Sequence, residues 1–148
     1  MSHRSPRPSP DRDSEPYWQA LRESELRLQR CSGCGALRWP PRALCNRCRS
    51  FDAHWERLSG RGRLVSWVRT HQVFAPAYRD EVPYRTVQVA LLEQDDILVI
   101  GGWQGGDDPV VGQHVEARFT VLPAAAEDEE SFVLLDWAPH LGVAGEQD

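Results

Sequence analysis

The sequence predicts a mainly β protein in two parts: a short helix with a cysteine-rich metal-binding unit, followed by a five-stranded barrel. Three observations lead to this prediction. All four cysteines of the 148-residue chain lie within residues 31–48. Five segments with strand patterns follow the glycine at position 60, and no convincing long helical pattern interrupts them. A short amphipathic pattern with a proline in its first turn precedes the cysteines.

The stretch 14–25 is predicted to form the helix, with Tyr17, Trp18 and Leu21 on one face. Residues 1–13 before it are rich in proline, serine and arginine, so we expect a disordered tail there. The N-terminus has no apolar region of the kind found in signal peptides, and no run approaches the length of a membrane-spanning helix. These features predict a cytoplasmic protein, in which clustered cysteines indicate metal binding rather than disulfides.

Two Cys-x-x-Cys pairs supply four metal ligands: Cys31, Cys34, Cys45 and Cys48. This spacing is typical of a zinc ribbon, and four thiolates without an open position make a closed, structural site. Gly35 follows the first pair, where a positive φ lets backbone N–H groups point at sulfur, whereas Arg49 follows the second. The sequence therefore predicts one structural zinc ion. A rubredoxin-like iron site uses similar ligands and is the alternative.

The sequence contains no lysine, so its 17 Lys and Arg residues are all arginines. Four of the arginines surround the cysteines: Arg38, Arg42, Arg47 and Arg49. One interpretation is that they offset the negative charge of a metal ion bound by four thiolates. The other is that they bind phosphate, for which the planar guanidinium is well suited.

Five strands are predicted after the cysteines, over 61–74, 84–94, 96–104, 114–122 and 131–139, with a tight turn over 93–96. In the first of them, strict alternation would place Leu64, Ser66, Val68 and Thr70 on one face and Val65, Trp67 and Arg69 on the other. A long first strand flanked by glycine, followed by four more, predicts a small barrel of the OB type. A simple antiparallel sandwich is the alternative.

Charge divides the chain and bears on its function. Residues 1–60 carry 11 Arg and 7 acids, a net of +4, whereas residues 61–148 carry 6 Arg and 15 acids, a net of −9. Zinc ribbons and OB barrels often bind single-stranded nucleic acid, which is our alternative function. An acidic barrel counts against it, because phosphate backbones demand a basic groove. The acidic run 127–130 lies in the loop between the fourth and fifth predicted strands.

The sequence does not predict an independent enzyme. It contains no glycine-rich phosphate loop, no nucleophile elbow and no paired-carboxylate motif. The five histidines are scattered, without the spacing of metal ligands. His71 is the best-placed candidate for a general base, but Ser66 and Thr70 nearby do not complete a triad.

The order of these features resembles a family of bacterial and archaeal proteins that join a rubredoxin-like zinc ribbon to an OB fold and accompany acyl-CoA enzymes. The likeness runs from about Tyr17 to Trp137. It rests on the helical "YW", then "LRLQRCSGCGALRWPPRALCNRC", "GRLVSW", "VPYRTVQVALLEQDD" and "VVGQHVEARF". Two features depart from the family pattern: no glycine follows Cys48, and the run 127–130 is acidic.

The resemblance implies a non-catalytic accessory subunit in a hetero-oligomer. Its partner would be a thiolase-superfamily enzyme, which it binds and stabilises or activates: a thiolase, a hydroxymethylglutaryl-CoA synthase or a lipid-transfer-type aldolase of steroid side-chain degradation. The family pattern places zinc on the four cysteines and supplies no catalytic residue. Candidate contacts to the partner or to CoA are the ribbon arginines (Arg38, Arg42, Arg47 and Arg49) and three aromatic residues, Phe74, Tyr78 and Tyr84. The aromatic residues could instead pack over the open end of the barrel.

The predicted organisation therefore has four segments. A disordered tail over 1–13 precedes a helix and zinc ribbon over 14–58, and an OB-like barrel over 59–138 precedes a flexible tail over 139–148.

Overall fold

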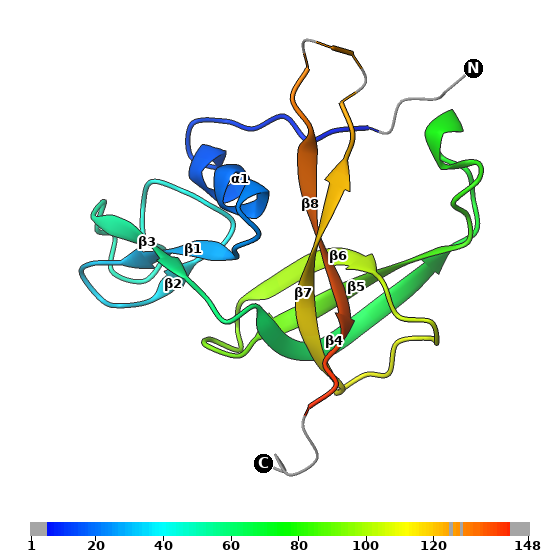
Figure 1. Cartoon of the computed structure of the whole chain (residues 1–148). Coiled ribbons are helices and arrows are strands. Elements are labelled where there is room, and N and C mark those ends of the chain that lie inside the picture. Colours follow the sequence, from blue (N-terminus) through cyan, green and yellow to red (C-terminus); the bar gives the residue numbers. More distant parts are fainter. Residues whose placement is uncertain (1–5, 125, 128, 143–148) are drawn as a thin grey trace.

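The fold contains a small three-stranded sheet beside a closed five-stranded barrel (Figure 1), and its computed structural model describes residues 6–124, 126–127 and 129–142. The first part comprises helix α1 (Glu15–Arg22) and strands β1 (Arg27–Cys31), β2 (Leu37–Arg38) and β3 (Ala53–Arg57), in the sheet order β2-β1-β3. The barrel comprises β4 (Arg61–Thr70), β5 (Tyr84–Leu91), β6 (Leu98–Trp103), β7 (His114–Leu122) and β8 (Phe132–Pro139).

The barrel strands close in the order β4-β5-β6-β8-β7. Strands β6 and β8 pair in parallel, while the other neighbouring strands of the barrel are antiparallel. A simple antiparallel sandwich has no parallel closing pair, so this topology confirms the mainly β, OB-like prediction. Only one short 3-10 turn, Pro76–Tyr78, interrupts the strands among the described residues of the barrel.

Helix α1 packs its apolar face between the ribbon and strand β8. Tyr17, Ala20 and Leu21 are buried, and the Tyr17 ring lies 5.0 Å from the Trp39 ring of the ribbon. Trp18 lies 5.0 Å, between ring centroids, from Phe132 of β8. The helix thus joins both parts through aromatic contacts. No helix of the described residues is long and apolar enough to cross a membrane.

The chain before α1 runs against the β7–β8 hairpin, although we expected a disordered tail over 1–13. The Arg7 guanidinium donates to the carbonyl oxygens of Glu130, at 3.0 Å, and Pro123. It also lies 3.7 Å from the Glu129 carboxylate, and Arg22 of α1 lies 3.2 Å from that of Glu130. Two arginines therefore form ion pairs with carboxylates of the acidic loop. Residues 1–5, and residues 143–148 of the predicted flexible tail, lie outside the described residues.

The turn between β5 and β6 attaches the barrel to the ribbon. The Gln94 side-chain oxygen accepts a hydrogen bond from the Leu37 N–H at 2.9 Å, and Arg47 forms an ion pair with Asp96 at 2.6 Å. The chain passes from ribbon to barrel through Leu58, whose N–H donates to the Leu26 carbonyl at 2.8 Å. These contacts fix the ribbon relative to the barrel from two sides.

A β-bulge in β4 changes which side chains face outward. The pairing between β4 and β5 shifts between Leu64 and Ser66, so that Ser66 pairs with Gln88 and Val68 pairs with Thr86. Leu64 is buried, whereas Ser66 and Val68 are exposed. The prediction that these residues share one face was wrong, because the extra residue of a bulge reverses the alternation beyond it.

Trp137 of β8 fills the middle of the barrel and is fully buried. It can lie there because β6 has a glycine at the point of closest approach. A Cβ atom on Gly101 would lie 2.8 Å from the Trp137 ring and 2.6 Å from the Leu135 carbonyl oxygen. The large indole and the glycine are therefore complementary parts of one packing arrangement.

We predict that Gln94→Ala lowers the free energy of unfolding by about 1–2 kcal/mol, because it leaves the buried Leu37 N–H without an acceptor. Urea denaturation followed by tryptophan fluorescence measures this change. Gln72→Ala, at an exposed position of the loop after β4, is the control and should change stability by less than about 0.5 kcal/mol. Equal effects of the two substitutions would contradict a role for Gln94 in joining ribbon and barrel.

Candidate functional site

The two cysteine turns have the same backbone geometry. In each, the first cysteine donates its N–H to the carbonyl five residues later, at 2.8 and 2.9 Å. The N–H four residues later donates back to the first cysteine's carbonyl, at 2.9 and 3.0 Å. The residue at that fourth position has a positive φ, 76° for Gly35 and 63° for Arg49. Arg49 therefore adopts the conformation that glycine adopts in the first turn.

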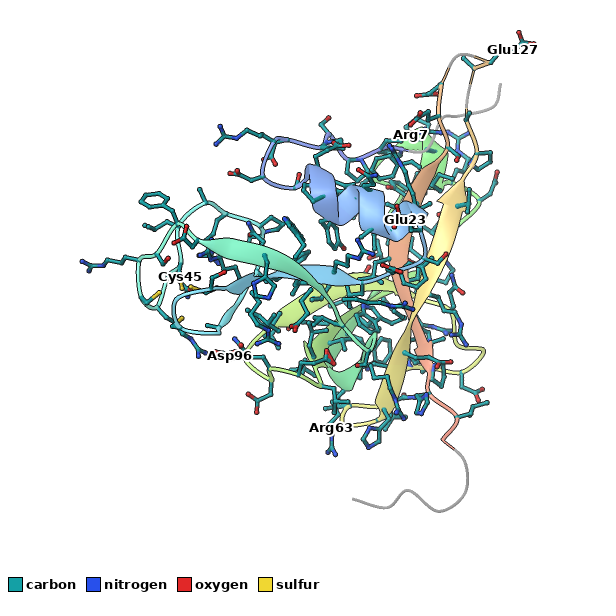
Figure 2. The ribbon with its side chains drawn as sticks, turned by 60° about the vertical axis from the view of Figure 1, so that its left-hand side comes forward. Arg7, Glu23, Cys45, Arg63, Asp96 and Glu127 are labelled. Carbon is teal, nitrogen blue, oxygen red and sulfur yellow. The ribbon has the colours of Figure 1, made fainter. Side chains whose placement is uncertain are left out.

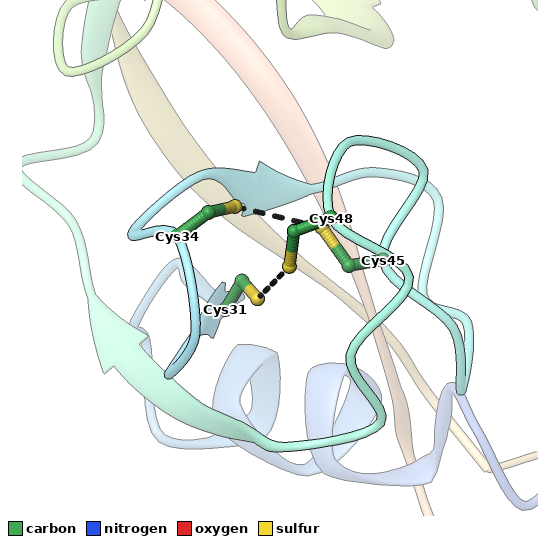
Figure 3. A group of neighbouring side chains, drawn as sticks. All are labelled: Cys31, Cys34, Cys45 and Cys48. Carbon is green, nitrogen blue, oxygen red and sulfur yellow. Dashed lines mark hydrogen bonds between the residues drawn. The ribbon is translucent and has the colours of Figure 1, made fainter.

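The four cysteine sulfurs converge between these turns (Figure 3), and all of them lie within 4.8 Å of one another. The Sγ atoms of Cys31 and Cys48 are 3.4 Å apart, and those of Cys34 and Cys45 are 3.7 Å apart. Sulfurs bound tetrahedrally at about 2.3 Å from a zinc ion are about 3.8 Å apart. Disulfide bonds require about 2.05 Å, so the cysteines are free thiols. The residues present fit one tetrahedral metal ion.

Local hydrogen bonds and mutual repulsion act on these thiols in opposite directions. The Cys34 N–H, together with Arg38 and the Gly33 N–H, lowers the pKa of Cys31 to about 5, although burial opposes this. The N–H groups of Cys48 and Arg47 lower the pKa of Cys45.

The Ser50 N–H also acts to lower the pKa of Cys48. Hydrogen bonding of the Cys48 thiol with the other three cysteines outweighs this and raises its pKa to about 11. Four thiolates at this spacing repel one another, so full ionisation requires added positive charge. A bound divalent metal ion supplies that charge.

Arg38 lies inside the ribbon, where the sequence suggested a surface contact. It is the one buried charged residue among the described residues, with 1% of its surface exposed. Its two terminal nitrogens donate to the carbonyl oxygens of Ala43, Ser50 and Asp52, each at 3.0 Å. Those carbonyls lie on both sides of the second cysteine turn. Arg38 is therefore unavailable to a ligand at the surface of this chain.

The other three arginines of the predicted set remain at the ribbon surface. Arg42 is half-buried and donates to the Trp39 carbonyl at 2.6 Å. Arg47 and Arg49 are exposed, and Arg47 pairs with Asp96 as described above.

The three aromatic residues lie around the first barrel loop. Phe74 is 72% exposed, while the rings of Tyr78 and Tyr84 contact each other at an interplanar angle of 38°, with their centroids 5.6 Å apart. Figure 1 places the ribbon and this loop at opposite sides of the molecule. Ribbon arginines and loop aromatics therefore do not form one continuous ligand site on this chain.

The outer face of β4, β5 and β6 is a second candidate, which the sequence analysis missed. Cross-strand neighbours place eleven side chains or glycines on it: Arg63, Ser66, Val68, Thr70, Tyr84, Thr86, Gln88, Ala90, Leu98, Ile100 and Gly102. Only Arg63, which pairs with Ala90 at one end of this surface, is charged, although 26% of the chain is. We call the other ten positions the uncharged face. Val68 and Ile100 are 60% and 63% exposed, and a shallow hollow lies between them.

This face bears on the alternative function and on catalysis. An OB barrel that binds single-stranded nucleic acid does so with several cations and stacking aromatic residues, whereas this surface of β4, β5 and β6 has one cation, Arg63, at its edge. Trp67 does not project from it, because it packs partly buried against the barrel core. His71, the candidate general base, is exposed in the loop after β4.

Comparison with known families is consistent with both parts of the fold. Residues 18–53 match the family described as "ChsH2, rubredoxin-like zinc ribbon domain", and residues 55–120 match "ChsH2, C-terminal OB-fold domain". A solved structure described as "Ltp2-ChsH2(DUF35) aldolase" is similar with a TM-score of 0.74 and 27% identity, covering 90% of this chain and 98% of that one.

Two curated relatives give functional names. The "3-oxo-4,17-pregnadiene-20-carboxyl-CoA hydratase alpha subunit" of Mycobacterium tuberculosis is 32% identical over 136 residues, which are 90% of this chain and 40% of the relative. A "DUF35 domain-containing scaffold protein" of Methanocaldococcus jannaschii is 27% identical over 75% of this chain and 79% of the relative. The chain thus spans two fifths of the length of the hydratase subunit.

We predict that Cys45→Ser loses most of its bound metal and much of the ribbon's stability, because metal binding and folding are linked in such sites. Metal content per chain by mass spectrometry and the melting temperature measure both effects. Ser32→Ala, an exposed residue beside the first cysteine, is the control and should keep its metal. An unchanged metal content in Cys45→Ser would contradict the four-cysteine site.

A second prediction concerns the positive φ of Arg49. Arg49→Gly should raise the free energy of unfolding by about 0.5–1 kcal/mol, because glycine removes a strain of about 1–2 kcal/mol and the gain is partly offset by a more flexible unfolded chain. Chemical denaturation of the metal-loaded protein measures it. Arg49→Ala keeps the strained φ and should give no such gain, so equal stabilisation by both changes would refute the explanation.

Proposed function

Because this chain belongs to the ChsH2 family, in which a rubredoxin-like zinc ribbon precedes an OB-fold domain, we propose that it is a non-catalytic accessory subunit of an acyl-CoA enzyme. The partner is a thiolase-superfamily protein, a thiolase or retro-aldolase, which the chain binds and stabilises or activates. The names of the similar aldolase structure and of the pregnadiene-carboxyl-CoA relative support steroid or lipid side-chain degradation as the setting.

The uncharged face is the observation that carries the binding role. Interfaces between proteins are depleted of charged residues at their centres, and exposed apolar patches of this kind mark protein contacts. Ten uncharged positions across three strands, with Arg63 at their edge, form such a centre on a chain with 39 charged residues in its sequence, 17 Arg and 22 acids. We therefore assign the partner to this face, with Tyr84 within it and with Phe74 and Tyr78 in the adjoining loop as further contacts.

Acyl-CoA is proposed to contact the ribbon instead. Arg42, Arg47 and Arg49 lie at its surface, and guanidinium groups form charge-assisted hydrogen bonds with phosphates such as those of CoA. Arg47 would exchange its ion pair with Asp96 for such a contact. Arg38 is left out of this proposal because it is buried. Direct CoA contacts then require that the partner's active site approach the ribbon.

We also propose that the four cysteines hold one structural zinc ion. Four thiolates leave no open coordination position, so the ion supplies folding energy rather than reaction chemistry. The ribbon is small, and its buried residues Leu26, Leu28 and Leu37 form only part of the core that they share with the barrel. A metal crosslink between its two turns is the usual means of stabilising so small a unit.

The experiment is co-expression with the products of the neighbouring genes, followed by a search for a thiolase-like protein that co-purifies with this chain. We expect a stable complex from co-expression, and no acyl-CoA turnover by the chain alone. Ile100→Glu, combined with Val68→Glu, should abolish the complex while the barrel remains folded, because both side chains are exposed and a buried unpaired charge is costly at an interface. Size-exclusion chromatography and circular dichroism provide the two measurements.

Val110→Glu is the matched control, because Val110 is 64% exposed but lies outside the uncharged face. It should leave the complex intact. Persistence of the complex in the double variant would refute the assigned face, and absence of any complex together with tight binding of single-stranded DNA would favour the alternative function.

A further inference from the structure

Arg38 has an unusual environment for a charged side chain. It lies on β2, directly after the first cysteine turn, and its guanidinium reaches across to the carbonyls that flank the second. A fourth carbonyl, that of Arg42, lies 3.4 Å away. Its Nε atom is buried and has no hydrogen-bond partner among the described residues. A cation buried in this way needs a counter-charge, since carbonyl dipoles alone do not carry one.

Carboxylates do not supply that counter-charge. Within the described residues no Asp or Glu forms an ion pair with Arg38. By contrast, three other arginines of this part of the chain each pair with a carboxylate: Arg27, Arg30 and Arg47. The side chains of Cys31 and Cys45 lie within hydrogen-bonding reach of its guanidinium, so the ionised sulfurs of the metal site are the counter-charge available to it.

We propose that Arg38 is a positioning residue of the metal centre, which holds the two cysteine turns together through backbone carbonyls and offsets the negative charge of a metal ion bound by four thiolates. This inference rests on the zinc ion of the proposed function. The Arg38 side chain thus has two roles. The terminal nitrogens hold the backbone of the second turn, and the fixed charge stabilises ionised sulfur in both turns.

Two substitutions separate these roles, because one removes both the charge and the hydrogen bonds to the carbonyls and the other keeps the charge. Arg38→Met removes both while retaining a long apolar side chain. Arg38→Lys keeps a positive charge but cannot present a planar fork to three carbonyls at once. If Arg38 acts only through its hydrogen bonds to the carbonyls, both variants should lose the same zinc affinity. If its charge also matters, the lysine variant should retain more zinc affinity than the methionine variant.

The experiment measures the zinc affinity of the full chain by competition with a chromophoric chelator. Arg38→Met should bind zinc about 10–100-fold more weakly than wild type, the usual effect of losing an outer-shell partner. Arg38→Lys should bind at least about tenfold more tightly than Arg38→Met. Arg49→Met removes an exposed charge from the same ribbon, and because solvent screens that charge it should bind within about threefold of wild type.

The proposal is overturned if Arg38→Met binds zinc as wild type does, or if the lysine variant binds no better than the methionine variant. Should Arg38→Met fail to fold, the lysine variant decides: affinity within about tenfold of wild type supports the counter-charge, and a larger loss refutes it. Failure of the wild-type chain to bind zinc at all would instead refute the proposed metal. Partner binding plays no part in these measurements.

Discussion

Backbone carbonyls from both sides of the second cysteine turn converge on one buried guanidinium, and the geometry of the ribbon depends on that convergence. Each cysteine turn closes through its own hydrogen bonds, but nothing within a single turn determines how far it lies from the other. Arg38 spans that gap together with the pairing of β1 and β3 and the Ser32 N–H, which donates to the Asp52 carbonyl at 2.9 Å. A buried cation is tolerated only beside negative charge, and ionised sulfurs this close together are tolerated only beside positive charge. The cation and the sulfur cluster therefore stabilise each other, and a metal ion held by the four sulfurs would add positive charge to the same balance.

The consequences extend from the ribbon to the barrel. Leu37 precedes Arg38 on β2, and its N–H is held by Gln94 from the barrel turn. Displacement of β2 would break this contact and disturb the aromatic packing of Trp39 against α1. Because α1 also packs on β8 through Trp18, the ribbon, helix and barrel form one connected body (Figure 2). A partner protein that contacts both the ribbon and the barrel would therefore meet a preformed surface, with little ordering required on binding.

Much of this architecture follows from local sequence signals, and the exceptions have specific causes. The predicted strands over 84–94, 96–104, 114–122 and 131–139 lie close to β5, β6, β7 and β8, because hydrophobic alternation and turn residues both indicate them. Strands β2 and β3 carry no such signal, since they are short and form only by pairing with β1. Arg38 could not be distinguished from its neighbours, because burial of an arginine depends on carbonyls supplied by distant residues. The spacing of the cysteines, by contrast, indicated their convergence directly.

The bulge in β4 has the largest consequence for function, and alternation alone could not reveal it. Without it, Val65, Trp67 and Arg69 would project from the barrel, and an exposed tryptophan beside arginine is typical of surfaces that bind single-stranded nucleic acid. One extra residue turns Ser66, Val68 and Thr70 outward instead and directs Trp67 toward Val87. The side chains that this ten-residue strand presents outward therefore depend on a single step in register. The overall acidity of the barrel does not describe this face. Its one charged residue, Arg63, lies at its edge, and so few charges suit a protein interface better than a phosphate backbone.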